Sequence, residues 1–165
     1  MSDKVAVVGF DPGLDGGIAI LRPDAAPELH IMPTLETGQG SKRTLDAGRI
    51  MQILLDANPR VVIVEKQQAF PKQGGVSNFT MGLNFGTLLG LLCGLEMAHQ
   101  VVTPREWGKA LGVSGKSKDD GCGAVLVAQR MFPGVNLLAT ARCRLAHDGL
   151  ADALLIAEYG RRVTA

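Results

Sequence analysis

The chain has 165 residues, of which 46% are hydrophobic and 20% are charged, so it is long enough for one well-buried core but small for two. We therefore expect a single domain over residues 1–165, and the net charge of +1 gives no hint of a nucleic-acid partner. The three cysteines, Cys93, Cys122 and Cys143, are far apart, which argues against a disulfide framework and against a zinc site.

The first part of the chain is predicted to form three short strands. Residues 4–11 are an apolar run, residues 11–17 carry the proline and glycines of a turn, and residues 18–21 and 28–32 are further short runs. Strands that follow one another so closely are typical of an antiparallel meander. Residues 33–40 are expected to form a loop.

A helix is predicted next, from residue 41 to about residue 58, where the Asn58-Pro59 pair ends it. A fourth strand over residues 61–65 precedes a polar loop over residues 66–76. The apolar positions that recur near the helical period in the first of these segments are Leu45, Ile50, Ile53 and Leu54.

The remaining elements alternate between helices and one more strand. Their order predicts an α/β domain with a mixed five-stranded sheet, in which an antiparallel meander and parallel strands are flanked by helices. The predicted elements are a helix from about 77 to 99, a strand at 100–103, a helix at 104–111, a loop at 112–118, a helix at 119–131, a loop at 134–146, and a helix at 148–159 with Gly160 as its C-cap.

The most apolar segment, Met81 to Ala98, raises the question of a membrane span, but it is marginal in length and contains Glu96. A buried helix of a soluble core is the favoured interpretation, so we expect no membrane partner. The charged residues Asp3 and Lys4 argue against a signal peptide, and the unpaired cysteines suit a reducing compartment. Both observations indicate a cytoplasmic protein.

Two carboxylates stand at the ends of the most apolar strands, Asp11 after residues 5–10 and Glu65 after residues 61–64. If these strands are neighbours, both side chains face the crevice where ligands of open α/β sheets bind. An unpaired carboxylate is costly there, whereas a shared hard cation such as Mg²⁺, with Mn²⁺ able to substitute, makes the cluster stable. Asp11 alone could equally be a turn-forming residue before Pro-Gly.

Asp148 and Asp152 complete the candidate set of acids. Their i, i+4 spacing places them on one face of the last predicted helix. Together with Asp11 and Glu65 they could hold two metal ions, which activate water and stabilise the leaving oxygen of a phosphodiester. Asp148 could instead be the N-cap of that helix, and the two roles are compatible.

These acids lie within short motifs that together resemble the RuvC-type Holliday junction resolvases, in the ribonuclease-H-like superfamily, and most of all the phage and prophage branch. The resemblance covers most of the chain, and the combination is specific although no single motif is. The motifs are Gly9-Phe10-Asp11-Pro12-Gly13, Val64-Glu65-Lys66-Gln67, the glycine-rich helix from Gly82, Thr103-Pro104-Arg105-Glu106-Trp107 with Lys109, the loop lysines Lys116 and Lys118, and residues 148–157.

The resemblance implies a ribonuclease-H-like fold and a Mg²⁺-dependent crossover junction endodeoxyribonuclease, acting as a homodimer without a small-molecule cofactor. Each subunit would nick one strand of four-way or branched DNA and leave 5′-phosphate and 3′-hydroxyl ends. It also implies that Asp11, Glu65, Asp148 and Asp152 are catalytic metal ligands. Lys118 would stabilise charge near the scissile phosphate, unless it is a solvated loop lysine.

One position departs from the pattern of many relatives, which place the last two acids three residues apart. Gly149 occupies that earlier position here, and the acid is Asp148 instead. The neighbouring His147 could also reach the site. Asp152 keeps the expected position, and either Asp148 or His147 could complete the metal set.

A second group of residues is expected to contact DNA. Phe70 stands in the polar loop after Glu65, where its ring could stack on bases at the junction centre or pack under its own loop. Phe79 is a weaker candidate that could belong to the core, and Trp107 is expected to serve packing. The expected phosphate contacts are Lys72, Lys109, Lys116 and Lys118.

Four glycines recur every four residues on the long predicted helix, at Gly82, Gly86, Gly90 and Gly94. Each costs about 1 kcal/mol relative to alanine in a helix, so the stripe needs a reason. Close backbone approach supplies one, either to the sheet or to the same helix of a second subunit across a two-fold axis. The sequence leaves both surfaces open.

Other functions match parts of the same pattern. An RNA–DNA hybrid nuclease would keep the fold and change the substrate, and a non-catalytic junction-binding module would keep only the binding residues. Asp11-x-Gly13 followed by Gly16-Gly17 also resembles the phosphate loop of actin-like or sugar-kinase-like ATP-binding proteins. Those proteins need two related domains, for which this chain is too short.

Overall fold

The computed structural model describes residues 5–38, 42–69, 74–113 and 123–164. The strands are β1 (Val7–Asp11), β2 (Gly17–Leu21), β3 (Glu28–Ile31), β4 (Thr34–Glu36), β5 (Arg43–Leu45), β6 (Val61–Glu65) and β7 (His99–Val102). The helices are α1 (Ala47–Ala57), α2 (Gly75–Gly94), α3 (Pro104–Leu111), α4 (Gly123–Met131) and α5 (Asp148–Val163).

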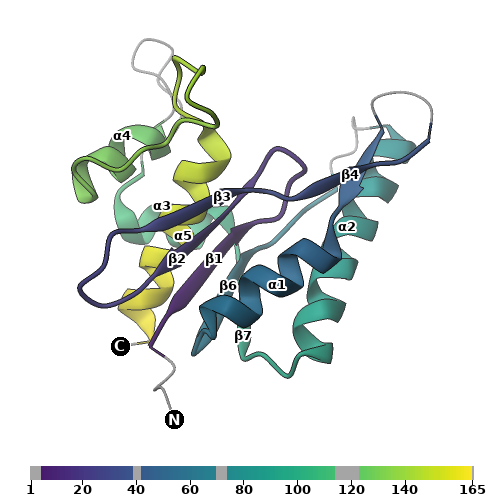
Figure 1. Ribbon diagram of the computed structural model, residues 1–165, viewed down its shortest axis with the longest axis horizontal. Helices are drawn as coiled ribbons and strands as arrows, with labels where there is room; N and C mark the ends of the chain where they lie inside the picture. The colour runs from purple at the N-terminus through teal and green to yellow at the C-terminus, as the bar shows by residue number, and fades with distance from the viewer. Residues whose placement is uncertain (1–4, 39–41, 70–73, 114–122, 165) are drawn as a thin grey trace.

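A five-stranded sheet in the order β3-β2-β1-β6-β7 forms the centre, with helices on both faces (Figure 1). β1, β2 and β3 form an antiparallel meander, while β6 pairs parallel with both β1 and β7. The predicted α/β class with a mixed five-stranded sheet is therefore confirmed. β4 and β5 form a separate two-stranded hairpin, which the sequence did not predict.

The two central strands carry the candidate acids. β1 and β6 run parallel with Phe10 opposite Val64, so the next residues, Asp11 and Glu65, reach the same end of the sheet. The expectation that these strands are neighbours is confirmed. In the antiparallel pairing with β2, Asp11 lies opposite Gly17, the first residue after the turn.

Alternation along the strands gives the sheet two different apolar cores. Val7 and Ile63 belong to the core that includes α3, α4 and α5, whereas the residues next to them in the chain belong to the core with α1 and α2. Figure 1 shows α1 and α5 on opposite faces of the sheet. Because side chains alternate, Asp11 and Glu65 both belong to the α5 face.

One predicted helix begins too early. Residues 43–45 form β5 and pair with β4, whereas the apolar period had placed Leu45 in a helix starting at residue 41. α1 begins after Asp46, whose side chain accepts a hydrogen bond from a backbone N–H of the first turn at 2.9 Å. It ends where expected, at Asn58, which adopts the left-handed conformation.

The last helix is longer than predicted. α5 continues through Gly160 to Val163, and its C-cap is Thr164. A Cβ on Gly160 would collide with Ile63 and lie 3.0 Å from Cγ1 of Val7, so this glycine allows α5 to lie close to the sheet. Its role is packing inside the helix, and the prediction of a C-cap is wrong.

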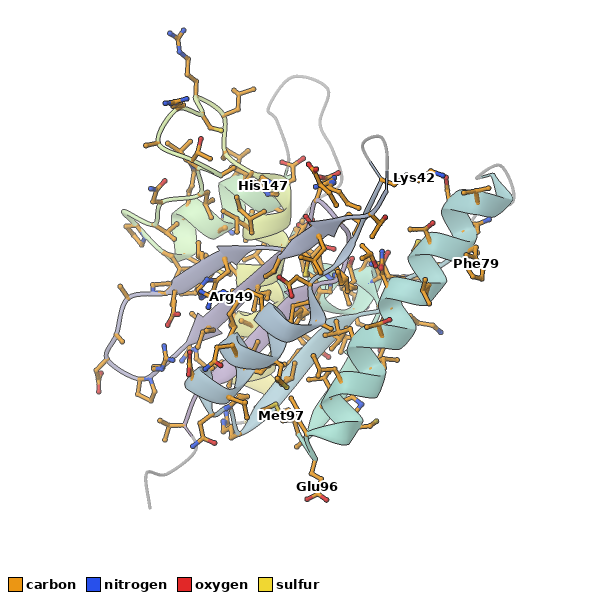
Figure 2. All side chains as sticks on the ribbon, turned by 45° about the vertical axis from the view of Figure 1, so that its right-hand side comes forward. Lys42, Arg49, Phe79, Glu96, Met97 and His147 are labelled. Atoms are coloured by element: carbon orange, nitrogen blue, oxygen red, sulfur yellow. The ribbon has the colours of Figure 1, made fainter. Side chains whose placement is uncertain are left out.

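The longest helix is mostly exposed, contrary to the expectation of a buried core helix. α2 packs on the rest of the chain through Asn84, Leu88 and Leu92, and it ends at Gly94, earlier than predicted. Figure 2 shows α2 along one side of the molecule with Phe79 on its outer side. Phe79 is 71% exposed and therefore not a core residue.

Candidate active site

Asp11 and Glu65 form the centre of the candidate site. Both residues are half-buried at the carboxyl ends of adjacent parallel strands. Their carboxylates are close enough for the negative charge of Asp11 to raise the pKa of Glu65. The structure therefore brings together two acids that are 54 positions apart in the sequence (65 minus 11).

Burial dominates the electrostatics of Asp11. It raises the pKa of this carboxyl above its ordinary value, because the charged form loses hydration. A hydrogen bond from the Gly13 N–H to Oδ1 at 3.3 Å, and the positive charge of His147 when that ring is protonated, lower the pKa, but they do not offset burial. The hydrogen bond is that of the predicted turn, so Asp11 both shapes the turn and faces the site.

Glu65 is perturbed more strongly. Burial, followed by the negative charge of Asp11, raises the pKa of Glu65 to about 7, although a hydrogen bond from Trp107 acts in the opposite direction. A glutamate with such a pKa at the end of a central strand marks a candidate functional site, because a structural acid is normally compensated by a cation.

Trp107 is a site residue that the sequence analysis missed. Trp107 is buried, as expected of a packing residue, but its indole Nε1–H also donates to Oε1 of Glu65 at 2.9 Å. The available signal was general: a buried tryptophan usually finds an acceptor for its single N–H. The spacing of 42 residues gave no indication of which acceptor it would be.

Asp148 is not the N-cap of α5, which was one of the two roles considered for it. The N-cap is His147, whose Nδ1 accepts a hydrogen bond from the Leu150 N–H at 3.3 Å, and Asp148 is the exposed first residue of the helix. With Nδ1 as the acceptor, the neutral imidazole carries its proton on Nε2. Metal binding through Nε2 would therefore require a tautomer change and loss of the cap, which favours Asp148 over His147 as a ligand.

The surroundings of Gly149 explain why no acid stands three residues before Asp152, where many relatives have one. A Cβ on Gly149 would lie 2.5 Å from the carbonyl oxygen of Asp15 and 2.6 Å from Cα of Gly16, so no side chain fits between α5 and the β1–β2 turn. An acid three residues before Asp152 is thus excluded sterically. Asp148 lies one position earlier, outside this contact, and Asp152 is half-buried one turn further along α5.

The donor set suits a divalent cation. Two half-buried carboxylates with raised pKa values repel each other, and a bound cation would offset the cost of charging both. Within the described ranges, however, no group of three or more His, Cys, Asp or Glu side chains is arranged to hold a metal ion. Asp11 and Glu65 come together, and the assignment of all four acids as ligands stays a prediction.

The expected DNA-binding residues are only partly visible. Lys109 is exposed in the last turn of α3, consistent with its availability for phosphate contacts. Asp15, in the turn between β1 and β2, is exposed and pairs with Arg43 at 2.6 Å. The other candidates, Phe70, Lys72, Lys116 and Lys118, lie outside the described residues.

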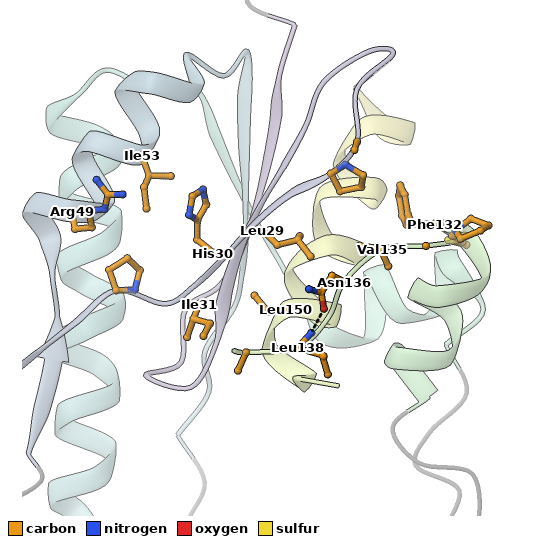
Figure 3. Close-up of a pocket in the computed structure, with 17 residues that line it drawn as sticks. Leu29, His30, Ile31, Arg49, Ile53, Phe132, Val135, Asn136, Leu138 and Leu150 are labelled. Atoms are coloured by element: carbon orange, nitrogen blue, oxygen red, sulfur yellow. Dashed lines mark hydrogen bonds between the residues drawn. The ribbon is translucent and has the colours of Figure 1, made fainter. Parts of the chain in front are cut away.

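A cavity of about 970 Å³ surrounds the edge strand β3. Figure 3 shows Arg49 and Ile53 of α1 on one side of it and Phe132 and Val135 on the other. None of the four candidate acids lines this cavity. The acids and the cavity are therefore separate features of the molecule.

The mixed sheet in the order β3-β2-β1-β6-β7, with helices on both faces, is the ribonuclease-H-like fold of solved RuvC structures. The chain is similar to RuvC of Thermus thermophilus, at 20% identity and a TM-score of 0.59 over 97% of each chain. The same protein in complex with a Holliday junction substrate gives a TM-score of 0.63 at 20% identity, over 98% of this chain and 97% of that one.

The yeast mitochondrial Holliday junction resolvase Ydc2 is also similar, with a TM-score of 0.58 at 17% identity, over 96% of this chain and 78% of that chain. No protein-family model matches the sequence, and no curated protein does. The RuvC-type, ribonuclease-H-like fold implied by the motifs is thus confirmed. The phage-like branch stays a prediction.

Proposed function

We propose that the chain is a metal-dependent, structure-specific endonuclease that resolves Holliday junctions or other branched DNA by paired nicking. The observation that carries this proposal is the acid pair Asp11 and Glu65 at the ends of adjacent parallel strands, in a chain that shares the RuvC fold along nearly its whole length. Because that RuvC is known with a Holliday junction substrate, four-way DNA is the first substrate to test.

Asp11, Glu65 and Asp152, with Asp148 beside them, would hold Mg²⁺ or Mn²⁺. When bound, such ions lower the pKa of water and neutralise the charge that develops on a phosphate. The chain contributes position: the strand ends fix the two central carboxylates, and N–H groups of Gly13 and Trp107 each bind one of their oxygens. Lys118, by its resemblance to the family, would add a positive charge near the scissile phosphate.

The glycine stripe supports the homodimer. Asn84, Leu88 and Leu92 face the rest of the chain, and a shift of two residues turns a helix by about 200°, so the stripe from Gly82 to Gly94 lies on the opposite face. Apart from the nearby backbone of α2 itself, a Cβ at any of the four glycines would meet no atom of the described residues within 4 Å. The sheet is thus not what the glycines approach, and we propose the α2 helix of a second copy.

Exposed apolar side chains on α2 also indicate a contact with another molecule. Val76 is 80% exposed and Leu83 53%, and among the described helices α2 is the one long and apolar enough to cross a membrane by length and composition. The small-residue stripe allows close helix–helix contact, which a second copy of α2 would supply. We therefore propose a soluble, cytoplasmic dimer, with its two acid sites matched to the two cleavage points of a junction.

The test is digestion of a labelled synthetic four-way junction with Mg²⁺, with Mn²⁺ and with EDTA, beside an RNA–DNA hybrid duplex. We expect paired nicks in the junction only when a divalent metal is present. DNA binding in Ca²⁺ should weaken as salt rises, because phosphate contacts release counterions. Faster cleavage of the hybrid would identify a hybrid nuclease, and ATP binding by calorimetry would favour the ATP-binding class.

Variants of the acids give the first prediction. Asp11→Asn and Glu65→Gln should each abolish cleavage while the junction Kd in Ca²⁺ stays close to that of the wild type. Asp15→Asn is the matched control, because Asp15 lies in the same turn but is 83% exposed and paired with Arg43. Cleavage that persists in EDTA, or in both site variants, would contradict the proposed mechanism. Binding without any cleavage by the wild type would indicate a junction-binding module.

A further inference from the structure

Trp107 is the only tryptophan in the chain, and its side chain is 5% exposed. The indole belongs to the core on the α5 face of the sheet, together with Leu111 of the same helix and Val102 of β7. Its Nε1–H donates to Oε1 of Glu65 at 2.9 Å. The apolar part of the side chain is thus fixed in the core, while its single polar atom contacts the candidate metal ligand.

A short, well-defined stretch of backbone fixes the indole relative to Glu65. Val102 pairs with Glu65 in the β6–β7 ladder, and the next residue, Thr103, caps α3. Thr103 Oγ1 accepts from the Glu106 N–H at 3.2 Å, and Glu106 Oε2 accepts from the Thr103 N–H at 2.6 Å. This capping box sets the start of α3 one turn before Trp107.

The chemistry of an indole suits a residue that orients a metal ligand. The N–H only donates and carries no charge, so it binds one lone pair of Glu65 without neutralising the carboxylate. Glu158 shows the contrast, because its carboxylate is held by the guanidinium groups of Arg161 and Arg162. A cationic partner of that kind at Glu65 would compete with a metal ion, and Trp107 does not.

We propose that Trp107 is a positioning residue that orients the Glu65 carboxylate toward a divalent cation, an inference that rests on the proposed function. Outer partners of metal ligands typically contribute about 10- to 100-fold in metal affinity or activity. The same contact makes Trp107 an internal reporter, because the single tryptophan of the chain then lies beside the bound metal.

Trp107→Phe removes the N–H donor and keeps an aromatic ring in the core. We expect calorimetric titration with Mn²⁺ to give an affinity about 10- to 100-fold weaker than that of the wild type. kcat for junction cleavage should fall, while the junction Kd measured in EDTA stays unchanged. In the wild type, tryptophan fluorescence should follow the same Mn²⁺ saturation curve, and Glu65→Gln should abolish that response.

Leu111→Ala is the matched control, because Leu111 is a buried residue of the same helix that supplies packing and no hydrogen bond donor to Glu65. It should lower the free energy of unfolding and leave the Mn²⁺ affinity of the folded protein unchanged. Equal Mn²⁺ affinity in Trp107→Phe and wild type, or wild-type fluorescence that Mn²⁺ does not change, would overturn the inference and leave the nuclease intact. Wild-type protein that binds no Mn²⁺ would overturn the proposed function together with the inference.

Discussion

Two glutamates on the α5 side of the sheet, the half-buried Glu65 and the buried Glu158, have pKa values shifted in opposite directions. Burial raises the pKa of Glu65, and the nearby charge of Asp11 raises it further. Burial would also raise the pKa of Glu158, but hydrogen bonds from Arg161 and Arg162 outweigh it and lower the pKa below its ordinary value. Glu158 is therefore a structural acid with its cations in place, whereas Glu65 lacks such compensation and remains available to an added cation.

Glu158 yields a prediction about stability and pH. Its carboxylate is 3% exposed and accepts from Arg161 Nε at 2.7 Å and from Arg162 Nε at 2.8 Å. Glu158→Gln should lower the free energy of unfolding by about 1–2 kcal/mol near neutral pH, because charge-assisted hydrogen bonds are lost. Urea unfolding of both proteins measures the difference.

The pH dependence of that difference has a definite sign. A carboxyl whose pKa is lowered in the folded state stabilises the protein above its unfolded-state pKa, here 4.5, and the contribution is lost as the pH falls below that value. The difference in stability between the two proteins should therefore shrink as the pH is lowered below 4.5. A difference that stays constant from neutral to acidic pH would contradict the role assigned to Glu158.

At the residue scale, the sequence revealed the acids but not their partners. Asp11 and Glu65 could be predicted because each ends an apolar strand, and parallel neighbours end at the same edge. The Trp107 contact could not, because it depends on how α3 is rotated against β6. The fine structure of the α5 start was also out of reach, since aspartate is a preferred N-cap and histidine is not, yet the structure uses His147.

At the element scale, the position of α5 depends on glycines, which have no side chain to keep the helix away from the sheet. A methyl group on Gly9 of β1 would lie 2.9 Å from Cα of Ala157 and closer still to backbone atoms of Ala153 and Ala157. Toward the two ends of the helix, Gly149 is close to the backbone of the β1–β2 turn and Gly160 is close to the side chains of Ile63 and Val7. The helix that carries Asp152 is thus held against the strand that carries Asp11 by direct backbone packing.

Gly9→Ala tests this close packing. Because the added methyl would meet α5 backbone, which cannot rotate away, we expect a loss of about 3 kcal/mol in the free energy of unfolding. Gly48→Ala is the control, since its Cβ would meet only Asp46 Oδ1 at 3.5 Å, an ordinary contact. That variant should change stability by at most about 1 kcal/mol. Equal stabilities of the two variants in urea would contradict the packing argument.

The elements that the sequence predicted well are those with strong local signals. β6 follows the Asn58-Pro59 stop and α3 begins at a capping box, and both match their predicted bounds. The β4–β5 hairpin was missed because its strands have three residues each, too few to show a period of two. The end of α5 was missed because Gly160 carries the local signal of a C-cap but is used for packing.

At the scale of the whole molecule, α2 is the helix through which we propose that two copies of the chain meet. A single chain buries one face of this helix and leaves the glycine face open. A two-fold contact would cover the same face of both copies at once, as isologous interfaces do. The sequence shows that the glycines share one face of the helix. It does not show whether that face lies against the sheet or points away from it.

Gly86→Leu should therefore separate dimer formation from folding. Among the described residues of one chain, a Cβ at position 86 meets no atom within 4 Å beyond the nearby backbone of α2, and replacing glycine in a helix should stabilise it by up to about 1 kcal/mol. Across a close two-fold contact the same side chain would push the helices apart, so sedimentation equilibrium should show monomers where the wild type is dimeric. Junction cleavage should then change from paired to single nicks. Gly48→Leu on α1 should leave the dimer intact, and a Gly86→Leu protein that still dimerises and nicks in pairs would place the partner elsewhere.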